Sequence, residues 1–188
     1  MNQPKQVDQY TLGRLINRGG WGNGDVYEAT DPAGSRAVIK TYRWRFAWIG
    51  KILVRREVRA YERLRGISGV PALLPCDSRD TLALADVNAK AIVYSVTTEN
   101  CASVRASLQA LADAVHERRV YHMDLRNRGN ILIDAQGNPF IVDFASAVTF
   151  SGSGWLTRTL ESWCLAFDRY GLSKWLNYCD SFSTGARQ

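Results

Sequence analysis

The stretch HMDLRNRGN, residues 122–130, holds the side chains of this chain that are best suited to chemistry. Asp124 is a short carboxylate in a polar loop, where it can accept a proton from a hydroxyl group that attacks as a nucleophile. Asn130 offers a neutral amide oxygen, and Asp143 follows three apolar residues. Hard oxygen ligands of this kind suit Mg²⁺ together with substrate phosphates. Taken singly, each of the three is better explained as a turn or capping residue.

A glycine-dense segment near the N-terminus is the second candidate. Backbone N–H groups of such a loop can approach phosphates closely, and Val26 resumes an apolar strand pattern directly after it. On its own the segment is explained equally well as a glycine-rich hairpin. Its glycines are Gly19, Gly20, Gly22 and Gly24.

Lys40 ends the strand-like run AVIK, and Glu57 lies seventeen residues later on the apolar side of a helical pattern. A carboxylate on the buried side of a helix needs a cation. Neighbouring arginines one turn away are one source of that charge. The other is Lys40, whose ammonium group a carboxylate partner would hold toward a nucleotide's phosphates.

The elements that must position these residues divide the chain into two parts. In the first part, residues 1–95, the sequence pattern predicts five strands and one helix. The helix begins at Lys51 and ends at Gly66. The second, 96–188, predicts a helix over 104–119, a hairpin over 130–144 and one or two helices after the SGSG break at 151–154. The expected fold class is therefore α+β in two lobes. The five strands are expected over 10–16, 26–30, 36–42, 81–85 and 91–96.

The motifs together resemble the protein-kinase-like superfamily over roughly residues 10–150. The resemblance is carried by the order of a glycine loop, AVIK, a helix glutamate, YHMDL, NILID and IVDFASA. It implies a minimal kinase-like fold, with a five-stranded antiparallel N-terminal lobe that contains one helix and a reduced helical C-terminal lobe.

The resemblance also implies ATP and Mg²⁺ as ligands, with one role for each matched position. The glycines and Val26 would cover the nucleotide, and Tyr94 and Val96 would line it at the hinge between the lobes. Lys40 would contact the phosphates with Glu57 as its partner. Asp124, in the catalytic loop 122–130, would be the base. Asn130 and Asp143, the latter in the DFA motif 143–145, would bind Mg²⁺.

Departures from the kinase pattern narrow the family. Trp21 stands where the middle glycine is expected, Met123 replaces the usual arginine and Ala145 replaces a glycine. Only 45 residues follow Asp143, which is too few for a full helical lobe. The chain is in this respect similar to the compact bacterial kinases of the RIO and lipopolysaccharide (Kdo-type) group.

The catalytic loop is one residue longer than the kinase pattern between Asp124 and Asn130. The thirteen positions from Asn130 to Asp143 keep the usual kinase spacing, so the insertion lies within LRNRG. Asn127 is the rival ligand, but it breaks this spacing. Gly129 is expected to accommodate a bulge at little steric cost.

The resemblance implies a phosphotransferase whose acceptor is a hydroxyl group, expected on a sugar or lipid-linked envelope component. Two alternatives stay open: a RIO-like protein kinase, and a pseudokinase that binds nucleotide without transfer. The polar start and the lack of an apolar span place the chain in the cytoplasm or at the inner face of the membrane.

Net charge is +6, and basic residues crowd the stretch from Lys40 to Arg65. Such a patch fits an anionic partner. Within it, residues 42–50, YRWRFAWIG, interleave arginine with aromatic residues. The pattern suits a peripheral membrane contact or an anionic glycolipid, and also single-stranded nucleic acid. It is equally typical of a covered surface with solvated arginines. No specific nucleic-acid binding is expected.

Overall fold

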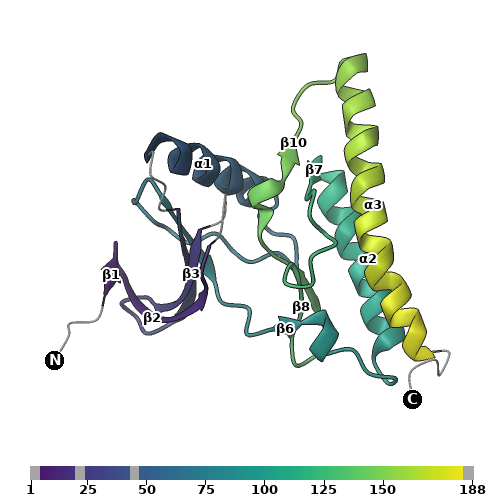
Figure 1. Ribbon diagram of the computed structural model, residues 1–188, viewed down its shortest axis with the longest axis horizontal. Helices are drawn as coiled ribbons and strands as arrows, with labels where there is room; N and C mark the ends of the chain where they lie inside the picture. Colours follow the sequence, from purple (N-terminus) through teal and green to yellow (C-terminus); the bar gives the residue numbers. More distant parts are fainter. Residues whose placement is uncertain (1–4, 20–23, 43–46, 184–188) are drawn as a thin grey trace. The chain divides into compact units, whose positions relative to one another are not determined.

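The computed structural model describes residues 5–19, 24–42 and 47–183, without the side chains of 47–51. Two compact units share the chain: residues 1–62 with 71–86, and residues 63–70 with 87–188. Figure 1 gives the labels of the helices and strands. Within the described residues, no helix is long and apolar enough to cross a bilayer.

The first unit is built on a five-stranded antiparallel sheet in the order β1-β2-β3-β4-β5. Its strands are β1 (Gln6–Val7), β2 (Tyr10–Asn17), β3 (Asp25–Thr30), β4 (Arg36–Thr41) and β5 (Thr81–Ala85). The chain from Ala47 to Arg63 forms α1, and Gly66 follows it at φ 85°, a conformation that favours glycine. Alternate residues of the strands form one core, with Tyr10, Leu12, Ala29, Ala37, Ile39 and Ala83 buried together.

The second unit has two packed helices, α2 (Cys101–Glu117) and α3 (Trp155–Ser183), which lie side by side in Figure 1. The helical spacing of Val104, Leu108 and Val115 gives α2 a fully buried stripe. On α3 the buried positions include Leu172, Trp175 and Cys179. Burial of these apolar stripes holds the helices together.

Five short strands also belong to this unit: β6 precedes α2, and the other four lie between α2 and α3. β6 (Lys90–Ala91), β8 (Ile131–Ile133) and β9 (Pro139–Ile141) form one antiparallel sheet, and β7 (Val120–Tyr121) pairs with β10 (Val148–Thr149). The β8–β9 hairpin turns at Gly137, at φ 87°, and its register places Ile131 opposite Ile141. Asn130 and Asp143 therefore flank the open end of this hairpin.

The predicted α+β class and the five-stranded antiparallel sheet are confirmed, but one predicted strand is wrong. Residues 91–96 form no strand of that sheet: β6 ends at Ala91, and Ile92–Tyr94 make a 3₁₀ turn. The turn forms because the N–H groups of Ser95 and Val96 both donate to the carbonyl of Ile92, whose side chain is buried. The fifth strand is instead β1, which the polar N-terminal sequence does not indicate.

Candidate functional site

Lys40 and Glu57 form an ion pair inside the first unit. The Lys40 Nζ atom lies 3.2 Å from each Glu57 carboxylate oxygen, and the two side chains are 6% and 0% exposed. The Tyr42 hydroxyl donates a further hydrogen bond to Glu57, and the Lys40 ammonium lies 5.2 Å from the Tyr42 ring. The predicted Lys40–Glu57 pair is therefore confirmed, and Glu57 is not a partner of surface arginines alone.

Desolvating such a pair is expensive, and apolar residues of similar size often stabilise a fold equally well. A contribution to the stability of the fold is therefore a poor explanation for the burial of this Lys–Glu pair. It fits a role in which the ammonium must be held at one place.

Gly24 lies against this pair. A Cβ atom at position 24 would meet the Thr41 carbonyl oxygen at 2.7 Å and the Lys40 Cγ atom at 3.1 Å. Val26 faces Lys40 in the β3–β4 register, and the Gly19 N–H donates to Asp25 across the glycine segment. Two of the predicted glycines, Gly20 and Gly22, lie outside the described residues.

The second cluster surrounds Asp124 in the other unit. The Asn130 amide group donates to the Asp124 carboxylate at 3.0 Å and to the Asp124 carbonyl at 2.9 Å. Its Oδ1 atom therefore points away from Asp124, and it accepts no hydrogen bond from the described part of the chain. The Asn130 carbonyl accepts from the Val142 N–H at 3.0 Å, which ties this residue to the one before Asp143.

Asp143 has left-handed backbone geometry, with φ 65° and ψ 66°. A non-glycine residue rarely adopts this conformation, and such strain is concentrated at functional sites. A 3₁₀ turn, Phe144–Ser146, follows it. The buried Phe144 ring packs 4.9 Å from the ring of His122, which links the DFA motif to the predicted catalytic loop.

The extra loop residue is accommodated by two consecutive turns. The Asn127 N–H donates to the Asp124 carbonyl, and the Asn130 N–H donates to the Asn127 carbonyl. Gly129 has no positive φ, so the expected use of its conformational freedom is wrong. The Asn127 Oδ1 atom accepts from the Gly129 N–H at 3.0 Å. The rival metal ligand is thus already engaged in the turn, whereas the Asn130 oxygen is not.

One buried carboxylate holds this loop, and sequence reasoning missed it. Asp168 of α3 is fully buried and accepts hydrogen bonds from the His122 N–H at 2.6 Å, the Met123 N–H at 2.7 Å and the His116 Nε2 atom at 3.1 Å. Met123 is at φ 65°, which brings its N–H beside that of His122. An acidic residue on the buried side of the α3 pattern was the available signal.

Two further contacts fix the loop on α3. The buried Trp175 ring donates from Nε1 to the Leu125 carbonyl at 2.7 Å. At Gly171 a Cβ atom would meet the Arg126 nitrogen at 3.1 Å, so the loop backbone packs directly on the helix. Asp124 is therefore placed by groups on both sides of it.

His122 is neutral in this setting. Burial lowers the pKa of its imidazole below the ordinary value, although Asp168, Asp143 and Asp124 act in the opposite direction. Its Nε2 atom donates to the Val142 carbonyl at 2.9 Å, and its Nδ1 atom accepts from the Asp124 N–H at 3.3 Å. Both ring nitrogens are thus used by the neutral tautomer.

The remaining predicted residues, at the hinge and in the stretch 42–50, agree less well with their predicted roles. Tyr94 is exposed, whereas the Val96 side chain is buried and its N–H is engaged in the 3₁₀ turn. Their place beside a nucleotide stays a prediction. In the stretch 42–50, Tyr42 is buried against Glu57 and is not a surface residue. The side chains of 43–50 lie outside the described residues.

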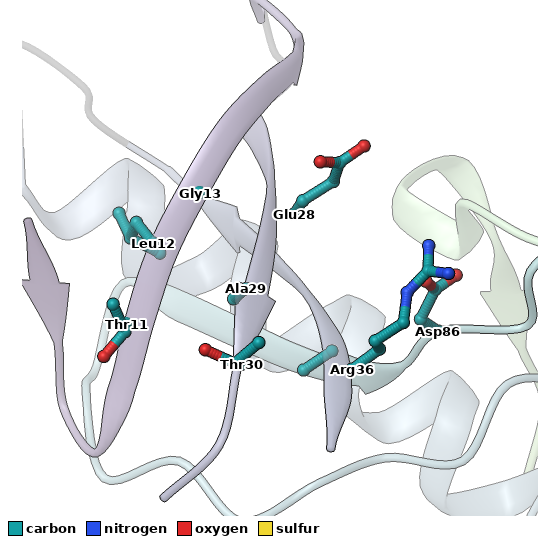
Figure 2. Close-up of a pocket in the computed structure, with 9 residues that line it drawn as sticks. Thr11, Leu12, Gly13, Glu28, Ala29, Thr30, Arg36 and Asp86 are labelled. Atoms are coloured by element: carbon teal, nitrogen blue, oxygen red, sulfur yellow. The ribbon is translucent and has the colours of Figure 1, made fainter. Parts of the chain in front are cut away.

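A cavity of about 260 Å³ opens on β2, β3 and β4 of the first unit (Figure 2). Its charged lining residues are Glu28, Arg36 and Asp86, and Arg36 pairs with Asp86 at 2.6 Å. None of the predicted site residues lines it.

The amide oxygen of Asn130 and the carboxylate of Asp143 are ligand types that suit Mg²⁺. This ion is held in proteins by one or two carboxylates, with water and substrate phosphates completing its shell. The described residues contain no cluster of three or more His, Cys, Asp or Glu side chains able to hold a metal alone.

No protein-family model and no curated protein matches the chain.

Replacing Asp168 by Asn should destabilise the protein by roughly 3 kcal/mol, because two backbone donors and His116 lose a charged acceptor. Urea unfolding measures this. Amide hydrogen exchange at His122 and Met123 should also become faster. Asp180→Asn is the matched control, since Asp180 forms an exposed pair with Arg105 and its loss should cost less than about 1 kcal/mol. Equal effects of the two variants would contradict the anchoring role of Asp168.

The neutral His122 should make stability depend on pH. The unfolded chain takes up a proton at His122 as pH falls through about 6.5, and the folded chain does not. Stability due to this group is therefore present above about pH 6.5 and is lost below it. Between about pH 7 and about pH 5.5, wild type should lose roughly 1 kcal/mol more than His122→Gln in urea unfolding. His116 is present in both proteins and cancels; an identical pH dependence would refute the assignment.

Proposed function

We propose that this chain is an ATP-dependent phosphotransferase with a kinase-like fold that moves the γ-phosphate of ATP to a hydroxyl group. The observation that carries the proposal is the buried Lys40–Glu57 pair. Its two members are seventeen residues apart, on β4 and α1, and the pair is explained by holding an ammonium group for phosphates.

The chain's own residues have separate tasks in this proposal. Lys40, held by Glu57, binds the nucleotide phosphates, and the backbone at Gly24 leaves room beside it. Asn130 and Asp143 would hold Mg²⁺, which when bound neutralises phosphate charge. The proposal requires that both clusters serve one nucleotide.

Asp124 accepts the proton of the acceptor hydroxyl. The acceptor oxygen forms a bond to the γ-phosphorus, the bond from that phosphorus to the β,γ-bridging oxygen breaks, and ADP leaves with that electron pair. The two hydrogen bonds from the Asn130 amide group orient Asp124 for this step, and Asp168 fixes the backbone immediately before it. Correct placement of the base is worth orders of magnitude in rate.

The acceptor that we propose is a hydroxyl of a sugar or lipid-linked envelope component. Support comes from the resemblance to the compact lipopolysaccharide kinases and from the basic composition of the chain, with net charge +6. A basic surface attracts phosphorylated or acidic acceptors.

The test is ATP turnover and Mg²⁺-dependent ATP binding in wild type, Asp124→Ala and Asp143→Asn. Asp124→Ala should keep binding and lose about 10²–10⁴-fold in turnover, because the base is gone. Asp143→Asn should weaken the Mg²⁺ dependence of the thermal shift. Asp113→Ala, an exposed carboxylate on α2, is the matched control and should behave as wild type.

Equal turnover in all four proteins would show that the assigned roles are wrong. Binding of ATP without turnover in wild type, with sugar, lipid and protein acceptors all tried, would instead identify a nucleotide-binding module that transfers no phosphate.

A further inference from the structure

An exposed apolar stripe runs along the first half of α3. It consists of large side chains separated by four, three, four and three positions, so they share one side of the helix. Trp163 is 74% exposed and Phe167 52% exposed, and Trp155 is exposed beside the stripe. This half of the helix extends past the end of α2 in Figure 1. The stripe residues are Leu156, Leu160, Trp163, Phe167 and Tyr170.

The charges around the stripe are basic. At its end, the Arg126 guanidinium lies 5.3 Å from the Tyr170 ring, and Lys174 continues the helical spacing one turn further on. Lys174 also donates to the Arg126 carbonyl at 3.0 Å, which keeps the two cations together. Two more exposed arginines, Arg158 and Arg169, lie on the same helix.

The acidic residues of α3 do not offset this charge. Glu161 pairs with Arg119 at 2.7 Å and Asp180 with Arg105 at 2.7 Å. Asp168 is buried and holds the catalytic loop. The exposed side chains Arg158, Arg169 and Lys174 are therefore not offset by these three carboxylates.

We infer that this stripe docks α3 on the surface of an anionic lipid bilayer. Trp and Tyr suit a boundary where one end of the ring is apolar and the other is wet, and basic side chains add attraction to anionic headgroups. The inference does not depend on the proposed phosphotransfer.

A second copy of the chain is the rival occupant, because the spacing also suits a paired helix. Aromatic rings fill three of the five stripe positions, whereas paired helices favour Leu, Ile and Val there and use flanking Glu–Lys pairs. In the half of α3 that carries the stripe, the exposed charged residues are Arg158 and Arg169, so two copies paired there would bring like charges together. The chemistry of the stripe therefore favours lipid.

The experiment is cosedimentation of the full chain with vesicles of phosphatidylglycerol and phosphatidylcholine, and with phosphatidylcholine vesicles alone. Wild type should bind the mixed vesicles and lose most binding at high salt or without the anionic lipid. Trp163→Gln with Phe167→Gln should weaken binding at least about tenfold. The matched control, Ile16→Gln with Ile52→Gln, removes two exposed apolar side chains of the first unit and should bind as wild type.

Both double variants should keep the wild-type unfolding midpoint, because the replaced side chains are exposed. A second readout is quenching of tryptophan fluorescence by brominated lipid, which should decrease in Trp163→Phe while binding is retained. Unchanged binding of the Trp163/Phe167 variant, or loss in the control variant alone, would overturn the inference. A wild-type dimer without lipid that the Trp163/Phe167 variant dissociates would assign the stripe to a second copy.

Discussion

The hydrogen bonds to the buried carboxylate of Asp168 are the interactions on which the second unit depends. It accepts hydrogen bonds from two consecutive backbone N–H groups and from His116, and Met123 adopts a left-handed φ to bring its N–H there. A buried charge is tolerated only when its hydrogen bonds are made, so helix and loop must fold together. The position of Asp124, and through it that of Asn130, follows from this constraint.

A second buried charge organises the first unit in the same way. Glu57 of α1 is fully buried and takes Lys40 of β4 and the hydroxyl of Tyr42 as partners. Each unit thus contains a buried carboxylate whose desolvation lowers stability and which fixes one polar group. Glu57 fixes an ammonium group, and Asp168 fixes a loop backbone. Costs of this kind are expected at functional sites, where placement matters more than stability.

Much of the fold and part of the candidate site could be predicted from the sequence, because the spacing of apolar residues indicates which side chains are buried. The strands 26–30, 36–42 and 81–85 and the Lys40–Glu57 pair are present as expected. The strand expected over 91–96 is wrong, since Ile92–Tyr94 form a 3₁₀ turn of the second unit that buries Ile92 and leaves Tyr94 exposed. The burial of Asp168 could be read from its place in the α3 pattern, but its partners could not, because they include backbone N–H groups 46 and 45 residues away, which side-chain patterns do not reveal.

The most direct test of the central claim is a crystal structure with a non-hydrolysable ATP analogue and Mg²⁺. The account predicts a metal ion bound by Asn130 Oδ1 and the Asp143 carboxylate at about 2.0–2.1 Å. It also predicts the Lys40 ammonium, still paired with Glu57, in contact with the nucleotide phosphates. A metal ion held by Asn127, or a nucleotide that touches neither Lys40 nor Asp143, would contradict it.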